Sequence, residues 1–434
     1  MISGLLQMFF NAADTVIVGQ FSADGDLAVS AVGSTGSVIN ALIALSMGMS
    51  NGAGVIVAQN TGAKNSEAVK NTVHTAMLLS LICGIVFGII GLILAPSVLK
   101  LISTPASVLP LATVYLRIYF AGLPVQLIYN FGSSILRAIG DTVRPLIFLL
   151  ISGVLNVGLN IVFVVLFNMS VTGVALATVI SQTISAVLVV VYMIKQKNNC
   201  KLSIKKLGIN LRYLSQILYI GIPAGIQGMI FSVSNVIMQS TINSFGPLAM
   251  SGSAATTSVA NFIFIPMNSI HHASTTVIGQ NTGAKKFEQV KKLTRMLLLI
   301  VATVGAVLSF IIVGLGKNLI GIYTDTPEAI NFGMIHLFVM ASPYFICGCM
   351  DVIVGCIRGM GTSLSPMLIS IFGVCGLRLV WIWGIFPLFE TMGLSVDIRY
   401  TLLFLSYPIS WTITFISQLI VYNRTYKKLV KRYS

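Results

Sequence analysis

Charged residues are scarce in this sequence. They make up 9% of the 434 residues, and hydrophobic residues make up 56%, whereas about a quarter of a soluble domain is charged. The mean hydropathy is +0.94, and no polar stretch is long enough to form a soluble domain. The sequence therefore predicts a polytopic membrane protein whose spans are helices, because a helix satisfies its own backbone hydrogen bonds in lipid.

Motifs of several other membrane proteins are also missing. The sequence has no Gly-x-x-x-x-Gly-Lys-Ser/Thr loop, which an ATP-driven pump would need. It has no Asp-x-x-Asp pair, which the metal of a membrane prenyl-group transferase would need. Its six cysteines show neither a disulfide framework nor a zinc pattern. We therefore expect no enzymatic activity, no resident metal and no cofactor.

One short stretch occurs twice. The six residues Gln59–Lys64 return unchanged as Gln280–Lys285, a shift of 221 residues. The same shift places Arg137 on Arg358, each followed three residues later by glycine. A single register that spans most of both halves indicates that the chain was built by doubling one unit.

Twelve apolar runs, six in each repeat, are long enough to cross a bilayer, which takes roughly 20 residues. They lie near residues 2–20, 32–57, 72–95, 111–135, 146–167, 172–194, 214–239, 252–278, 294–315, 331–356, 366–388 and 400–422. We expect Pro124 and Pro343 to kink their spans. An even number of spans gives the two repeats the same orientation, related by an axis along the membrane normal. The predicted fold is all-α, with two parallel six-helix bundles.

The basic residues predict how the chain is oriented. Lys and Arg number 26 against 11 acids, for a net charge of +15, which could also suggest a nucleic-acid partner. However, the basic residues lie in short connections, and with a cytoplasmic N-terminus only Lys100, Lys317 and Arg399 fall outside. Positive charge inside is typical of membrane topology. We therefore expect cytoplasmic termini in a bacterial plasma membrane and no nucleic-acid partner.

The repeat and the charge pattern together divide the chain. We expect an N-terminal lobe of residues 1–194, a basic cytoplasmic linker of residues 195–213, a C-terminal lobe of residues 214–423 and a basic cytoplasmic tail of residues 424–434. Parallel repeats of this kind favour alternating access by rocking of one half against the other, with the substrate site between them.

An ordered set of motifs resembles the multidrug and toxic compound extrusion (MATE) family along the whole chain. The set is Asn11–Gly19 in the first span, the two Gln-Asn-Thr-Gly-Ala-Lys connectors, Leu136–Asp141, Asn156–Asn160, Gly173–Thr178 and Cys356–Gly361. The chain is most similar to the bacterial branch with the DNA-damage-inducible-like members. The resemblance implies the MATE and flippase superfamily fold.

Two acids lie within predicted spans, Asp14 in the first and Asp351 in the tenth. A charge at mid-bilayer costs on the order of 3 kcal/mol on insertion scales, so such residues are candidates for function. The alternative is a carboxylate that only bonds neighbouring helices. Asn11 lies three residues before Asp14, on the same helical face.

Asn156 and Asn160 are four residues apart and share one face of the fifth span. The repeat register places Leu377 and Trp381 at their counterparts, so the fold itself does not require the polar pair. Hydrogen bonding between helices remains the alternative to a functional site.

The resemblance implies a role for these residues. It assigns Asp14, Asn156 and Asn160 to the cation-coupling site of the N-terminal lobe, with Thr178 as a further member. The site has a single acid, which favours a proton over Na⁺ as the coupling ion, because burial disfavours the charged form of a carboxyl group.

The register suggests a second cation or substrate site. It pairs Asp14 with Asn235, and Asn130 with Asp351, so that each half has an acid where the other has the amide. Arg378 lies in the eleventh span, and three roles stay open for it: it snorkels, pairs with an acid, or gates an outer cavity.

The resemblance implies a cation-coupled, proton-driven antiporter that exports amphipathic and often cationic organic molecules and acts as a monomer. The 18 methionines suit a promiscuous surface. The alternative is a flippase for a lipid-linked sugar or another amphiphile of the same superfamily. Such a flippase typically needs a cationic cavity for pyrophosphate, whereas the spans here contain Arg117 and Arg378 as their only clear cations.

Overall fold

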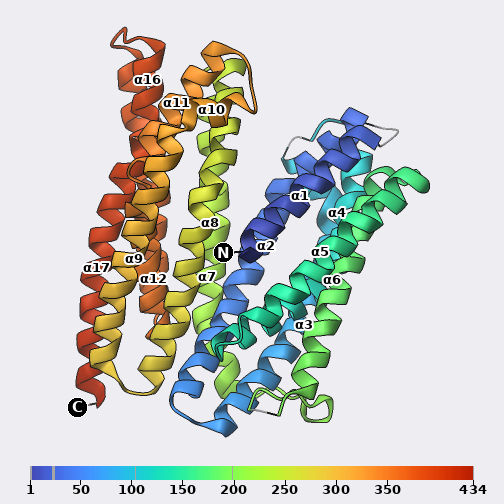
Figure 1. Ribbon diagram of the computed structural model, residues 1–434, viewed down its shortest axis with the longest axis vertical. Coiled ribbons are helices and arrows are strands. Elements are labelled where there is room, and N and C mark those ends of the chain that lie inside the picture. Colours follow the sequence, from blue (N-terminus) through green and yellow to red (C-terminus); the bar gives the residue numbers. More distant parts are fainter. Residues whose placement is uncertain (1, 22–24, 103, 198, 434) are drawn as a thin grey trace. The chain divides into compact units, whose positions relative to one another are not determined.

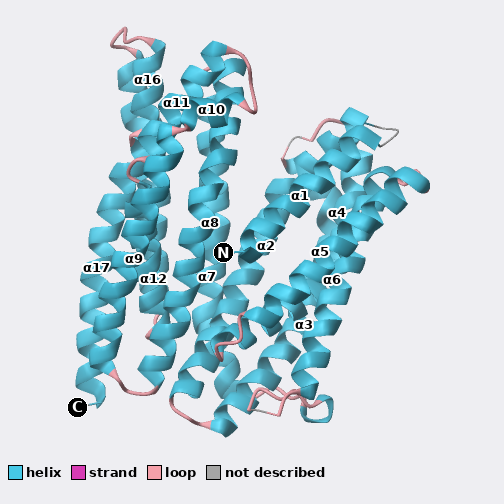
Figure 2. Ribbon diagram, in the orientation of Figure 1, coloured by secondary structure: helices cyan, strands magenta, loops and turns pink. Residues whose placement is uncertain are grey.

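The computed structural model describes residues 2–21, 25–102, 104–197 and 199–433. These residues form helices joined by short connections, and no strand occurs among them (Figure 2). The chain divides into two compact units, Met1–Gly225 (unit 1) and Ile226–Ser434 (unit 2). The helical fold class expected from the sequence is confirmed.

Unit 1 is built around one central helix. Its helices are α1 (Ile2–Phe21), α2 (Gly25–Gly62), α3 (Ser66–Leu101), α4 (Leu109–Ala138), α5 (Val143–Asn160), α6 (Ser170–Lys195) and the first part of α7 (Leu211–Asn243). Helix α4 packs against α2, α3 and α6 (Figure 1). Pro124 lies inside α4 without ending it, because neighbouring helices can satisfy the backbone groups that a proline frees.

Unit 2 repeats this plan with more interruptions. Its helices are α8 (Pro247–Gly283), α9 (Phe287–Gly314), α10 (Gly316–Gly321), α11 (Pro327–Ala341), α12 (Tyr344–Gly359), α13 (Leu364–Ser370), α14 (Leu377–Val380), α15 (Phe386–Glu390), α16 (Val396–Phe404) and α17 (Ser406–Tyr433), with the second part of α7. Helix α12 packs against α8, α9 and α17.

Each of the twelve predicted spans coincides with one helix or with consecutive helices. Ten helical runs of the described residues are long and apolar enough to cross a membrane, and the bent pair α11 and α12 makes an eleventh. The 20-residue α1 covers the first predicted span. The bend between α11 and α12 is 44° and lies at Ser342 and Pro343, where the sequence predicts a kink.

Three described segments within the predicted spans depart from α-helical geometry. They are the π-helical turns η1 (Ile161–Leu166), η3 (Ile371–Gly376) and η4 (Trp381–Ile385). The fifth span continues from α5 into η1, and the eleventh runs through α13, η3, α14, η4 and α15. Under the repeat register η1 and η4 occupy equivalent positions. Turns of this kind are rare and often lie at functional sites.

The segment between α6 and α7 packs against α3. The Ser203 amide donates to His74 Nε2 at 3.1 Å, and the Asn210 amide donates to Thr75 Oγ1 at 3.1 Å. Cys200 is 1% exposed, and burial raises the pKa of its thiol to about 12. Residues 199–210 are therefore part of the packed structure of unit 1.

The first part of α7 completes the core of unit 1. Ile217 and Ile220 are buried in that core. Two glycines of α2, Gly48 and Gly52, lie so close to α7 that an added Cβ would collide with its backbone at residues 217–225. Small residues permit such close approach of membrane helices. At the other end of the chain, α17 runs through Tyr433, so most of the predicted basic tail continues a helix.

Candidate functional site

Four of the residues predicted for the cation-coupling site form one hydrogen-bonded network in unit 1. Asn160 Nδ2 donates to Asp14 Oδ1 and lies 3.4 Å from Asn156 Oδ1. Asn156 Nδ2 in turn lies 3.4 Å from Thr178 Oγ1. Three elements contribute: α1 carries Asp14, α5 carries both asparagines, and α6 carries Thr178. Asn11 lies in α1, and its side chain is outside the described residues.

Local packing explains why these side chains meet. Helix α1 packs against α5, η1 and α6. The ring of Phe10, one turn before Asp14, lies where a Cβ at residue 153 would be, and Gly153 of α5 makes room for it. Asn156 and Asn160 point to the same side because four residues separate them. Both are at least 95% buried, so the amides lie inside the unit.

The network has oxygen atoms available for a cation. Asn160 Oδ1 is buried and has no hydrogen-bond partner among the described residues. A buried acceptor without a partner is costly and calls for an explanation. One ion pair occurs in the described part of the chain, Arg144 with Asp141 at 3.1 Å, so no Lys or Arg neutralises Asp14. The carboxyl group and Asn160 Oδ1 can accept a proton or take part in coordinating an alkali ion.

The sequence analysis missed two tyrosines of α4. Tyr115 and Tyr119 are both 7% exposed, and Tyr115 lies close enough to Asp14 to interact with it electrostatically. The Tyr119 hydroxyl accepts a hydrogen bond from Gln126 Nε2 at 3.0 Å. Their spacing of four residues, with a polar group on an otherwise apolar span, was the signal that could have identified them.

The residues predicted for a second site are divided between the two units. Asn130 is buried in α4 of unit 1, Asp351 is half-buried in α12, and Asn235 is exposed on α7. The backbone carbonyl of Asp351 accepts a hydrogen bond from His271 Nδ1 at 2.6 Å. Arg378 is 5% exposed, which argues against snorkelling, and no acid of the described residues lies within 4.0 Å of it.

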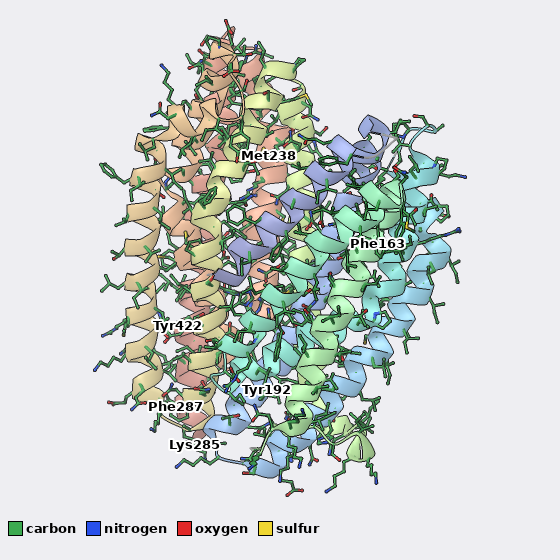
Figure 3. The ribbon with its side chains drawn as sticks, turned by 45° about the vertical axis from the view of Figure 1, so that its right-hand side comes forward. Phe163, Tyr192, Met238, Lys285, Phe287 and Tyr422 are labelled. Carbon is green, nitrogen blue, oxygen red and sulfur yellow. The ribbon has the colours of Figure 1, made fainter. Side chains whose placement is uncertain are left out.

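Two cavities lie at the repeated connectors. One of about 230 Å³ is lined in unit 1 by Asn60, Thr61, Lys64, Asn65, Ser66, Val69, Ile139, Asn199 and Cys200. The other, of about 470 Å³, is lined in unit 2 by Lys285, Lys286, Phe287, Glu288, Gln289, Tyr426 and Val430. Figure 3 shows Lys285 and Phe287 together at one end of unit 2. Neither cavity includes a residue of the Asp14 network. The described residues contain no group of three or more His, Cys, Asp or Glu that could hold a metal ion.

Solved structures share this fold. A MATE transporter in complex with MaL6 superposes with a TM-score of 0.90 at 20% identity, covering 99% of this chain and 95% of that one. The outward-facing conformation of a multidrug resistance MATE family transporter of the MOP superfamily also gives 0.90, at 19% identity, covering 99% and 94%. At this identity the likeness concerns the fold.

Sequence comparison identifies the family. The MatE family model matches residues 1–162 and 223–383. The chain belongs to the MATE family, as its motifs suggested, and is a multi-pass membrane protein.

Among its relatives, the Probable multidrug resistance protein YoeA of Bacillus subtilis is 28% identical over 385 residues, covering 87% of this chain and 83% of that protein. The Probable multidrug resistance protein NorM of Thermotoga maritima is 26% identical, covering 86% and 81%. The Multidrug export protein MepA of Staphylococcus aureus (strain MW2) is 21% identical, covering 86% and 82%.

Proposed function

We propose that this protein exports amphipathic organic molecules across the bacterial plasma membrane, driven by proton antiport through Asp14. The names of its relatives, multidrug resistance and multidrug export proteins, support the substrate class. The observation that carries the coupling proposal is the partly buried network of Asp14, Asn156, Asn160 and Thr178. In it one carboxyl group accepts a hydrogen bond from an amide whose own oxygen has no partner among the described residues.

The network gives the proton a defined position. A proton on Asp14 would turn its carboxyl group into a donor, and Asn160 Oδ1 is an acceptor that has no partner in the described part of the chain. Protonation also removes the charge of the Asp14 carboxyl group. It therefore lowers the free-energy cost of placing this side chain in a less hydrated environment. Proton binding from outside therefore favours one arrangement of α1 against α5, and release to the cytoplasm favours the other.

Alternating access completes the cycle. Bound substrate leaves outward in the protonated state, and deprotonation resets the transporter to face the cytoplasm. Parallel repeats suit this exchange because the two units can move as bodies. The single carboxyl group favours H⁺, because burial disfavours the charged form that Na⁺ binding would require.

Transport by purified protein in liposomes tests the proposal. We expect a pH gradient, and not a Na⁺ gradient of equal size, to drive uptake of ethidium, a permanently cationic dye. Asp14→Asn removes the protonatable group and should lower the coupled rate at least about tenfold, the loss expected from one interaction of 1.4 kcal/mol. Dye transport by Asp14→Asn at the wild-type rate under a pH gradient would contradict the proposal.

Asp325→Asn is the matched control. This acid is exposed between α10 and α11, where a conservative change should alter the rate less than about twofold. If wild-type protein moves no dye under either gradient but equilibrates a fluorescent lipid-linked amphiphile between leaflets, the flippase alternative replaces the antiporter.

A further inference from the structure

Arg378 occupies an unusual place in unit 2. It lies in the four-residue helix α14, directly between the π-helical turns η3 and η4. The repeat register places it on Val157, which is next to Asn156 of the Asp14 network. The eleventh span therefore carries a cation where the fifth span forms part of a site around an acid.

The Arg378 side chain is enclosed by aromatic rings. Its guanidinium carbon lies 3.9 Å from the ring centroid of Tyr407 and 5.9 Å from that of Trp411. Both rings belong to α17, where they are four residues apart and share a face. The side chain is 5% exposed, and its Nε has no hydrogen-bond partner among the described residues.

The acid of α12, Asp351, has another charged neighbour. The main charged neighbour of Asp351 is Arg358, whose Nη2 also donates to Gln227 Oε1 at 2.8 Å. Tyr344, which packs against Trp411 at 5.3 Å, precedes Asp351 by seven residues, or about 10 Å along α12. Arg378 is therefore left without a carboxylate partner among the described residues.

Aromatic faces alone do not balance such a cation. A cation–π contact stabilises a desolvated guanidinium by less than its removal from water costs. A buried charge is normally paired or fully hydrogen-bonded. Arg378 therefore has donors to spare for an anion.

A second polar group, Thr414, lies on α17, the helix that carries the two rings. The Thr414 side chain is fully buried, and its Oγ1 has no hydrogen-bond partner among the described residues. Thr414 follows Trp411 by three residues and Tyr407 by seven, so all three share one face of α17. An added Cβ at Gly373, in η3, would collide with this hydroxyl. The hydroxyl therefore lies against the span that carries Arg378.

We propose that Arg378 is the centre of an anion-binding site in unit 2. The site binds one anionic group that carries a single negative charge. Two sources offer that chemistry: the carboxylate of a transported amphiphile, or a free inorganic anion such as chloride. In the first case the site deepens the proposed export function, because it extends the substrates from cations to molecules that carry a carboxylate. Guanidinium groups recognise carboxylates by paired, charge-assisted hydrogen bonds.

Tryptophan fluorescence can test the site without any transport. The chain has three tryptophans, all in unit 2, and Trp411 lies beside Arg378. The full-length protein in lipid nanodiscs is titrated with octanoate, octanamide and octyltrimethylammonium, which share one alkyl chain and differ in charge. We expect a saturable change with octanoate only. Trp411→Phe should remove most of that change, and Trp383→Phe, at a ring that is 67% exposed, should keep it.

Variants of Arg378 decide the assignment. Arg378→Gln should weaken octanoate binding about tenfold or more, as expected for the loss of a charge-assisted bond, and Arg378→Lys should retain part of the affinity. Thermal unfolding provides a second readout, because octanoate should raise the Tm of the wild type and not that of Arg378→Gln. Equal responses to octanoate and octanamide, or wild-type affinity in Arg378→Gln, would overturn the proposal.

A chloride titration separates the two sources. Chloride that produces the same change and competes with octanoate identifies a site for free anions, and octanoate alone identifies a substrate carboxylate. These measurements involve no ion gradient. An Arg378-dependent octanoate response therefore supports the anion site even if Asp14→Asn retains coupled export, which would refute the proposed function alone.

Discussion

The fifth and eleventh spans occupy the same place in the repeat and differ in polarity. Both contain a π-helical turn at equivalent positions, η1 and η4. In the fifth span, Asn156 and Asn160 join the carboxyl group of Asp14. In the eleventh, Leu377 and Trp381 stand in their place and Arg378 meets aromatic rings. The doubled fold thus keeps the backbone irregularity in both copies and leaves the charge of the neighbouring side chains free to diverge.

The largest expected effect concerns the amides of the fifth span. Asn160→Ala removes the donor to Asp14, and hydrogen bonds to charged groups contribute about 1.5–3 kcal/mol. We expect coupled dye transport to fall roughly 10- to 100-fold. Asn156→Ala should have a smaller effect, because its contacts of 3.4 Å are long for hydrogen bonds. Initial rates in liposomes provide the measurement, and a larger loss from Asn156→Ala would reverse this ranking.

The next largest expected effect concerns how closely the second span of each repeat packs against its neighbours. Gly48→Ala should destabilise the protein by about 1–3 kcal/mol, because its Cβ would collide with the backbone of Gly225. The repeat places Ser269 at the equivalent position in unit 2, where a half-buried side chain is already accommodated. Ser269→Ala is therefore the control. Thermal unfolding in detergent measures both, and equal Tm values for the two variants would show that the α2–α7 crossing can relax.

Two buried arginines of unit 2 should respond in opposite directions. Arg358→Met leaves the Gln227 amide without its partner and should cost about 1–3 kcal/mol. Arg378→Met removes an unpaired buried cation and should leave stability unchanged or increase it when no anion is bound. The comparison is made by thermal unfolding without added carboxylate. A strong loss of stability in Arg378→Met would indicate that its aromatic contacts suffice.

The smallest effect concerns the segment that unit 1 alone possesses. With a pKa of about 12, the Cys200 thiol is ionised in only about one molecule in ten thousand at pH 8. Alkylation of a variant that retains Cys200 as its one cysteine should be slow at pH 8 and accelerate as pH rises toward 12. The unfolded chain, with a thiol pKa near 8.5, should react quickly at pH 8. Equal rates in the folded and unfolded states would show that residues 199–210 detach from α3.

Much of this arrangement could be predicted from the sequence, because a helix that crosses the bilayer requires roughly 20 predominantly apolar residues. Each apolar run predicted from hydropathy coincides with one helix or with consecutive helices, and Pro343 indicated the bend between α11 and α12. The spacing of Asn156 and Asn160 predicted a shared face, and the structure brings that face to Asp14. The assignment of these residues to ion coupling stays a prediction.

Other features depend on packing that no local pattern encodes. The π-helical turns have no sequence signature, since η1 and η4 differ in most of their residues. The rings around Arg378 come from a helix about 30 residues away, whereas Trp383, five residues from Arg378, is 67% exposed. The basic composition of the segment between α6 and α7 likewise did not indicate that the amides of Ser203 and Asn210 bond to α3.

The packing of α7 has a consequence for synthesis of the protein. Ile217 and Ile220 close the core of unit 1, and both lie after the sixth span. Because chains emerge from the ribosome N-terminus first and domains fold as units, six inserted spans still lack part of their own core. The first half of this transporter reaches its mature packing only after the seventh span has been made.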